Sequence, residues 1–214
     1  MVKNKSMESF INYNYKELTK GECIERILCV WLFGVAVCLL GKNNTIFFAL
    51  IIPVCLAITL LISVLAAKYI KLKGSRFLSD GISWLFYSIM LNLASYRFYM
   101  IFQHERNTAL IVVSLLSLPV SIMCYLLIVY RNIKLDKYGT KSGLSAIGGL
   151  ALLGGVFGIL VAKIMINSID QNDQVILVSL ILLFLSILVS SGSMNFLKYF
   201  LWRKLRKSEN TTNT

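Results

Sequence analysis

Residues that could carry out catalysis are few in this sequence, and they lie far apart. The one histidine, His104, is next to Glu105 and Arg106, whereas a catalytic zinc needs about three protein ligands. A Ser–His pair would also have to use His104, and no G-x-S-x-G motif accompanies it. Walker loops, dinucleotide-binding glycine motifs and Cys–His pairs are absent from the sequence. The sequence therefore predicts a protein that is not an enzyme and that uses no cofactor or metal.

Two charged side chains, Arg97 and Lys163, lie inside long apolar stretches. Each is near one end of its stretch, about 9 Å deep at 1.5 Å per residue, so each can extend to a polar surface. Alternatively, Arg97, Lys163 and Tyr99 line a site for an anion such as a lipid phosphate or a peptide carboxylate. Asn92 is the candidate for a polar cavity that holds or passes a small solute, because its amide can use up to four hydrogen-bond partners.

The composition indicates the solvent in which these stretches lie. Apolar residues make up 57% of the chain and charged residues 15%, whereas soluble domains average about 45–50% and about 25%. The net charge of +12 would suggest nucleic acid as a partner of a soluble protein. Here the basic residues form short clusters between apolar stretches, which is typical of a chain beside anionic lipid. We therefore expect the lipid bilayer to be a partner and nucleic acid not to be one.

Six stretches are long enough to cross a bilayer, for which a helix needs about 20 apolar residues. They cover residues 20–41, 45–67, 81–103, 108–130, 143–167 and 174–198. The expected fold is an all-α bundle of six transmembrane helices with no extramembrane domain. A basic lead (1–19) precedes the bundle and a basic, polar tail (201–214) follows it. The lead either lies along the membrane surface through its apolar side chains or is disordered.

Residues at the predicted helix ends support these boundaries. Thr19 and Glu22 have the spacing of a capping box, which starts the first helix near residue 20. Asp80, Asn107 and Asp173 are predicted N-caps of the third, fourth and sixth helices.

Basic residues are distributed unevenly between the stretches. Of the 22 Lys and Arg residues, 18 lie in or beside the N-terminal lead, in or beside the C-terminal tail, and in the segments after the second and fourth stretches, if Lys20, Arg26 and Lys198 at the span ends are included. The other three connecting segments hold only Lys42 and Arg106. Because Lys and Arg near span ends favour the cytoplasmic side, both termini are predicted to be cytoplasmic. Such short loops are typical of a multi-pass protein of the cell membrane, and a bacterial inner membrane fits best.

The stretch 143–167 carries small residues at spacings of three and four, which places them on one helix face. These residues are Gly148, Ala151, Gly155, Gly158 and Ala162. A face of small residues lets helix backbones approach closely in lipid. It is interpreted as the tightly packed centre of the bundle, as a seam for a second copy or a partner subunit, or as a face along which a helix slides.

Three other stretches carry polar residues at helical spacing. The sets are Ser88, Asn92, Ser95 and Tyr99; Ser114, Ser117, Ser121 and Cys124; and Ser179, Ser186, Ser190 and Ser193. Because unpaired polar groups are costly in hydrocarbon, these stretches should turn toward one another. Their side chains then either hydrogen-bond between helices or line a polar cavity.

Two classes of function follow from these patterns. The first is a non-enzymatic integral membrane protein that binds a membrane partner, either as an accessory subunit or as an immunity-type protein. The alternative is a small permease or channel subunit, including the membrane part of an ATP-driven exporter. Its ATPase would be a separate chain, because this one has no Walker motif. The basic segments 68–80 and 131–142 would then contact that ATPase.

Overall fold

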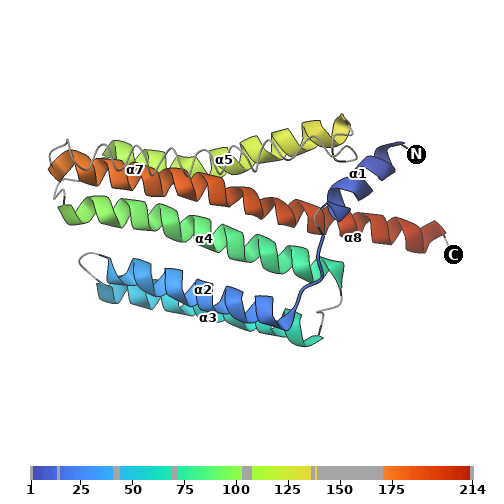
Figure 1. Ribbon diagram of the computed structural model, residues 1–214, viewed down its shortest axis with the longest axis horizontal. Helices are drawn as coiled ribbons and strands as arrows, with labels where there is room; N and C mark the ends of the chain where they lie inside the picture. The colour runs from blue at the N-terminus through green and yellow to red at the C-terminus, as the bar shows by residue number, and fades with distance from the viewer. Residues whose placement is uncertain are drawn as a thin grey trace.

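The computed structural model describes residues 2–13, 15–40, 44–68, 72–102, 108–135, 138 and 171–212. The elements are α1 (Val2–Asn12), α2 (Lys20–Leu39), α3 (Asn44–Lys68), α4 (Lys73–Phe102), α5 (Thr108–Lys134), α7 (Gln171–Ser190), η2 (Ser191–Ser193) and α8 (Met194–Thr212). Every regular element in this part of the chain is helical, which confirms the all-α class. The long helices run side by side along the molecule (Figure 1).

Three segments of the described helices are long and apolar enough to cross a membrane. They are Thr45–Ala67 in α3, Val112–Lys134 in α5 and Val175–Arg206, which runs from α7 into α8. These candidate spans indicate a membrane protein. The predicted spans 20–41 and 81–103 correspond to α2 and α4, which are less apolar because they carry Glu22, Arg26, Asn92 and Arg97. The predicted span 143–167 lies outside the described residues.

The start of α2 confirms the predicted capping box. The backbone N–H of Glu22 donates to Thr19 Oγ1 at 3.2 Å, and the Glu22 carboxylate accepts the backbone N–H of Thr19 at 3.0 Å. Two N–H groups that have no partner within the helix are thereby satisfied.

The predicted N-caps of α4 and α7 are wrong. Asp80 lies inside α4, which begins at Lys73, and its carboxylate pairs with Arg76 one turn earlier. This pairing supports the additional turns of helix ahead of the apolar stretch. Asp173 lies inside α7, which begins at Gln171. Asn107 lies outside the described residues.

The N-terminal lead folds onto the bundle. Phe10 of α1 is only 3% exposed. Ser6 Oγ donates to the carbonyl of Ile133 in α5, and Lys198 of α8 donates to the carbonyl of Tyr13 at 2.9 Å. Helix α1 therefore packs against α5 and α8, which neither interpretation of the lead anticipated.

Helices α7 and α8 form one nearly continuous rod, interrupted by the 3₁₀ turn η2 (Figure 1). Ser190 Oγ donates to the carbonyl of Ile187, and Ser193 Oγ donates to the carbonyl of Ser190, both at 2.6 Å. Such bonds to the carbonyl three residues earlier accompany bends in helices. Helix α8 continues to Thr212, so most of the segment predicted as a polar tail is helical.

Helix α4 occupies the centre of the bundle, between the α2–α3 pair and α7 (Figure 1). Its apolar residues join a buried core with α2 and α3. The core consists of Val30, Val37, Cys38, Ile51, Cys55, Phe86, Met90 and Ala94. Gly34 permits the close approach of α2 and α3, because a Cβ there would lie 2.6 Å from Cys55 Sγ. Helix α4 therefore lies within or beside each candidate site in the described part of the chain.

Candidate functional site

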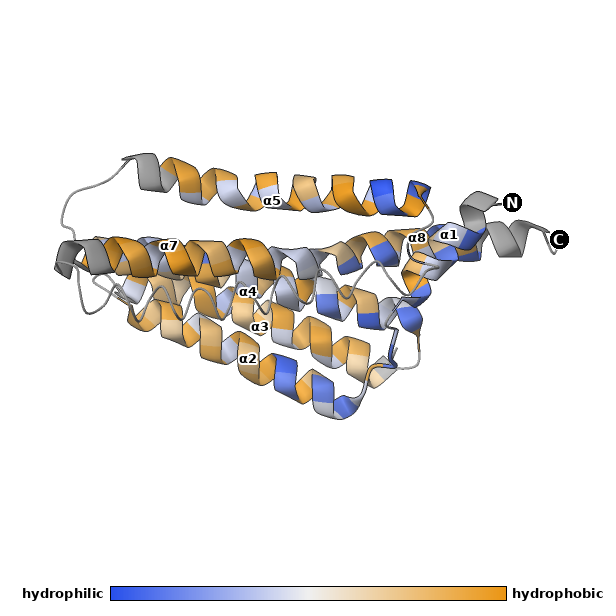
Figure 2. Ribbon diagram, turned by 45° about the horizontal axis from the view of Figure 1, so that its top comes forward, coloured by the Kyte–Doolittle hydropathy of each residue, from blue (hydrophilic) through white to orange (hydrophobic). Residues whose placement is uncertain are grey.

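Hydrophilic residues gather at the end of the bundle where both termini lie, and apolar residues dominate the rest of the helices (Figure 2). We call this region the polar end. It consists of α1, α8, the first turns of α2 and α4, and the last turn of α5, which carries Arg131 and Lys134. The described basic segments thus meet at one end of the molecule.

An ion-pair network at the polar end joins α2 to α4. The Asp80 carboxylate pairs with Arg26 and, at 3.1 Å, with Nε of Arg76. Arg76 also pairs with Glu22 at 2.8 Å. Burial alone would lower the pKa of Arg76, but the adjacent Asp80 and Glu22 carboxylates outweigh burial and raise this pKa. Because Glu22 also caps α2, the network fixes the start of α2 against α4.

Another cation, Lys198, is surrounded by aromatic side chains at the junction of α1, α4 and α8. Its Nζ lies 5.4 Å from the ring centre of Phe10, 5.8 Å from that of Phe77 and 5.9 Å from that of Tyr13. Cations within about 6 Å of an aromatic face are attracted to it. Together with its hydrogen bond to the Tyr13 carbonyl, this arrangement holds α1 onto α8.

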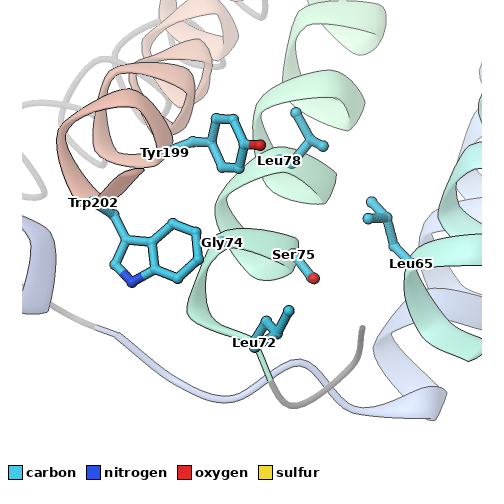
Figure 3. Close-up of a pocket in the computed structure, with 7 residues that line it drawn as sticks. All are labelled: Leu65, Leu72, Gly74, Ser75, Leu78, Tyr199 and Trp202. Atoms are coloured by element: carbon cyan, nitrogen blue, oxygen red, sulfur yellow. The ribbon is translucent and has the colours of Figure 1, made fainter. Parts of the chain in front are cut away.

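Two adjacent pockets lie at the polar end. The first has a volume of about 250 Å³ and a mostly apolar lining from α3, α4 and α8 (Figure 3). Its lining residues are Leu65, Leu72, Gly74, Ser75, Leu78, Tyr199 and Trp202. The second has a volume of about 450 Å³ and a more polar lining. It shares Leu72 and Trp202 with the first pocket, so the two are neighbours.

Asn92, the predicted cavity residue, forms hydrogen bonds between helices. Its Nδ2 donates to the Ser114 carbonyl at 3.0 Å and to Ser117 Oγ at 2.9 Å, both in α5. Its exposed fraction is 9%. Both amide hydrogens are therefore used to hold α4 against α5.

Arg97, the predicted anion-site residue, lies on a different side of α4. It is 4% exposed, its Nε donates to the carbonyl of Leu40 at the end of α2, and its guanidinium lies 3.6 Å from the ring centre of Phe47 in α3. Tyr99 is buried as well. The structure thus directs Arg97 toward α2 and α3 and Asn92 toward α5, and does not bring these two residues together.

The remaining predicted site residues cannot be placed in this arrangement. Lys163 and the small-residue face formed by Gly148, Ala151, Gly155, Gly158 and Ala162 lie outside the described residues. The anion site and the partner face therefore stay predictions.

The serine stripes of α4 and α7 face each other, as their spacing predicts. Ser88 Oγ donates to the Ser186 carbonyl at 2.6 Å, and Ser186 Oγ donates to the Ser88 carbonyl at 2.9 Å. Ser95 Oγ donates to the Ser179 carbonyl at 2.6 Å. We call these four residues the serine seam. All four are buried, and the bonds among them give the interhelical interpretation direct support.

Sequence reasoning missed the pockets of the polar end. The available signal was the pattern Tyr199, Trp202 and Arg206 in α8, at spacings of three and four, which places two aromatic rings and a cation on one helix face. Because residues 201–214 are predicted to be a tail, this helix face was not predicted. The contribution of α1 to the pockets could not be predicted from a local sequence pattern.

No protein family, curated protein or solved structure matches this chain. Among the described residues, no group of three or more His, Cys, Asp or Glu side chains is placed to hold a metal ion.

Proposed function

We propose that this chain is a multi-pass protein of the cell membrane that crosses the bilayer six times, has both termini in the cytoplasm and binds another membrane protein. It does so without catalysing a reaction. The three candidate spans support the membrane location. The collection of hydrophilic residues at the end that holds both termini supports the orientation, because basic ends favour the cytoplasmic side (Figure 2).

The observation that favours binding over transport is how the bundle uses its polar side chains. Ser88 and Ser186 bond to each other across α4 and α7, and Asn92 gives both amide hydrogens to α5. A route for a polar solute needs groups that can exchange partners with that solute. Side chains committed to neighbouring helices instead support a fixed bundle whose outer surface is the functional surface.

The partner that fits this surface is a transmembrane helix. We propose that this partner helix binds the small-residue face of 143–167, because small residues permit the close backbone contact on which association in lipid depends. An accessory subunit and an immunity-type protein both fit this description.

A topology experiment tests the membrane arrangement. Protease-cleavable tags are placed at either terminus and at Gln171, and intact cells are treated with protease from outside. Cleavage is expected only at Gln171, where α7 begins. Cleavage at a terminus would contradict the proposed orientation.

Crosslinking in cells, followed by purification in mild detergent, tests partner binding. The wild-type chain should be recovered in a complex with a second membrane protein. Gly155→Leu, which fills the small face, should reduce recovery, whereas Phe157→Leu, on the opposite side of a helix, should not. Recovery of the wild-type chain alone as a monomer would contradict the proposal.

One observation favours the second candidate, a permease or channel subunit. Arg97 is a buried cation in the predicted span 81–103, and intramembrane cations often mark solute or ion pathways. This candidate predicts that Arg97→Ala and Asn92→Leu abolish solute flux in reconstituted vesicles. Unchanged flux in both variants would remove this route, and a co-purifying ATPase would favour an exporter.

A further inference from the structure

The apolar pocket of the polar end is built into the contact between α4 and α8. Trp202 lies directly against Gly74, where a Cβ would be 2.4 Å from Trp202 Cζ3 (Figure 3). Tyr199, one turn earlier on α8, and Leu78 on α4 continue the wall, and Leu65 of α3 lines the other side. Glycine at position 74 is therefore what allows the indole to form this wall.

This pocket is continuous with the membrane-crossing part of the molecule. Leu65 belongs to the candidate span Thr45–Ala67, and Tyr199 and Trp202 belong to the candidate span Val175–Arg206. A pocket walled by the ends of two spans lies at the level where a bilayer meets water, and Trp and Tyr are enriched at that level. Under the proposed topology the pocket therefore lies at the level of lipid headgroups and the adjoining acyl chains.

The adjoining pocket supplies charge. Lys73 and Arg206 line it, and both side chains are exposed. Lys73 is held by Asn12, whose Oδ1 accepts from Nζ at 3.1 Å, and the Arg206 guanidinium lies 5.5 Å from the Trp202 ring centre. Glu8 is the acidic residue of the described lining, so the two cations leave a positive balance.

We propose that the two pockets together bind one anionic phospholipid. Part of an acyl chain occupies the apolar pocket against Trp202, and the headgroup phosphate lies between Lys73 and Arg206. Arg and Lys both bind phosphate oxygens with charge-assisted hydrogen bonds, and basic residues at the cytoplasmic surface select anionic lipid. The inference rests on the proposed function, since it places the polar end at the cytoplasmic surface of the bilayer.

An acidic peptide would satisfy the cations equally well but would leave the apolar pocket unexplained. The pocket lies between the ends of candidate spans, where the available apolar ligand is an acyl chain. The combination of an apolar pocket and an adjoining cationic one therefore favours lipid.

Quenching of Trp202 fluorescence by brominated lipids tests this site. The chain has three tryptophans, and Trp31→Phe with Trp84→Phe leaves Trp202 as the only one. This variant is reconstituted in phosphatidylcholine vesicles that contain brominated phosphatidylglycerol or, separately, the same fraction of brominated phosphatidylcholine. Quenching by the anionic lipid should be about twofold stronger, because the cations enrich it next to Trp202.

Two sets of variants locate the effect. Lys73→Gln with Arg206→Gln should make the two brominated lipids quench equally, whereas Arg203→Gln with Lys204→Gln, elsewhere on α8, should preserve the preference. Ser75→Leu, which fills the apolar pocket, should weaken quenching by both lipids. Far-UV circular dichroism confirms that each variant is folded before it is compared.

Three outcomes would overturn the proposal. These are equal quenching by both lipids in the Trp202-only protein, loss of the preference in the Arg203 and Lys204 control, and loss of the preference on adding millimolar inorganic phosphate or an acidic peptide. The phosphate or peptide result would identify a soluble anion as the ligand. The vesicles expose both faces to the same lipid, so a wrong orientation would appear in the tag experiment and not here.

Discussion

Among the polar contacts that hold α4 in the bundle, the serine seam and the ion-pair network of the polar end use different chemistry. In the serine seam, neutral hydroxyls of Ser88 and Ser95 donate to backbone carbonyls of α7 and are fully buried. At the polar end, charged Asp80 and Arg76 pair with each other and with α2, and their side chains remain 15% and 17% exposed. Between its first turns and its middle, α4 therefore changes from ions to hydroxyls, and the buried cation Arg97 follows beyond Ser95.

The difference follows from the solvent available at each level. An ion pair removed from water loses hydration that mutual attraction only partly restores. A serine hydroxyl costs far less to bury and can bond to a carbonyl that already belongs to a helix. The change from ions to hydroxyls on α4 thus marks where the helix passes from the polar end into hydrocarbon under the proposed topology.

A larger side chain beside the serine seam should lower the free energy of unfolding more than any other change considered. Gly192 lies at its polar-end side, where a Cβ would be 2.3 Å from Trp84 Cγ. Gly192→Leu should lower the free energy of unfolding by about 3 kcal/mol, because the side chain cannot fit without moving α7 from α4. The measurement is unfolding by a denaturing detergent in mild micelles, followed by circular dichroism.

Gly21 provides the matched control, because no atom lies within 4 Å of a Cβ placed there. Gly21→Ala should leave stability unchanged or raise it by up to about 1 kcal/mol, through reduced backbone entropy in the unfolded chain. A Gly192→Leu protein as stable as the wild type would contradict the close packing of Trp84 against the α7–α8 junction.

Removing one charge from the ion-pair network of the polar end should also lower the free energy of unfolding. Asp80→Asn leaves Arg26 and Arg76 without their shared carboxylate and should lower the free energy of unfolding by about 2 kcal/mol, since the site is largely but not fully buried. High salt should reduce the difference between this variant and the wild type. Glu25→Gln, an exposed acid on α2 next to Arg26, is the control and should change stability by less than about 0.5 kcal/mol. An equal loss in both variants would show that net charge, and not the network, determines stability.

The features that could be predicted from the sequence are local or periodic. The Thr19–Glu22 capping box spans one turn, and the serine stripes repeat at the helical period, so both appear in the sequence as patterns. Asp80 was wrongly predicted as an N-cap because one of its partners, Arg26, is on another helix. An acidic residue before an apolar stretch gives the same local sequence pattern whether it caps the helix or forms an ion pair inside the helix.

For the candidate sites, the sequence could predict which residues of one helix are polar or charged, but not which neighbouring helix they contact. The sequence predicts Arg97 as a site residue because it is a charge inside an apolar stretch, and Asn92 because its amide can use several partners. In the structure Arg97 contacts Phe47 in α3, and Asn92 contacts Ser114 in α5. The choice of neighbouring helix depends on packing between segments that are distant in sequence. The docking of α1 through Phe10 has the same origin, since its contact surface exists only once α5 and α8 are assembled.

The smallest expected effect comes from removing single hydroxyls of the seam. Ser88→Ala deletes one donor while Ser186 still donates to the backbone carbonyl of residue 88, so the loss should be about 0.6 kcal/mol. Ser88→Ala with Ser186→Ala removes both bonds and should cost about 1.2 kcal/mol in the same unfolding assay, because the backbone carbonyls keep their helical partners. Ser63→Ala on the exposed side of α3 is the control and should have no measurable effect. If the double variant were as destabilised as Asp80→Asn, the hydroxyls would contribute as much as the ions, and the solvent-based distinction between the two regions would be wrong.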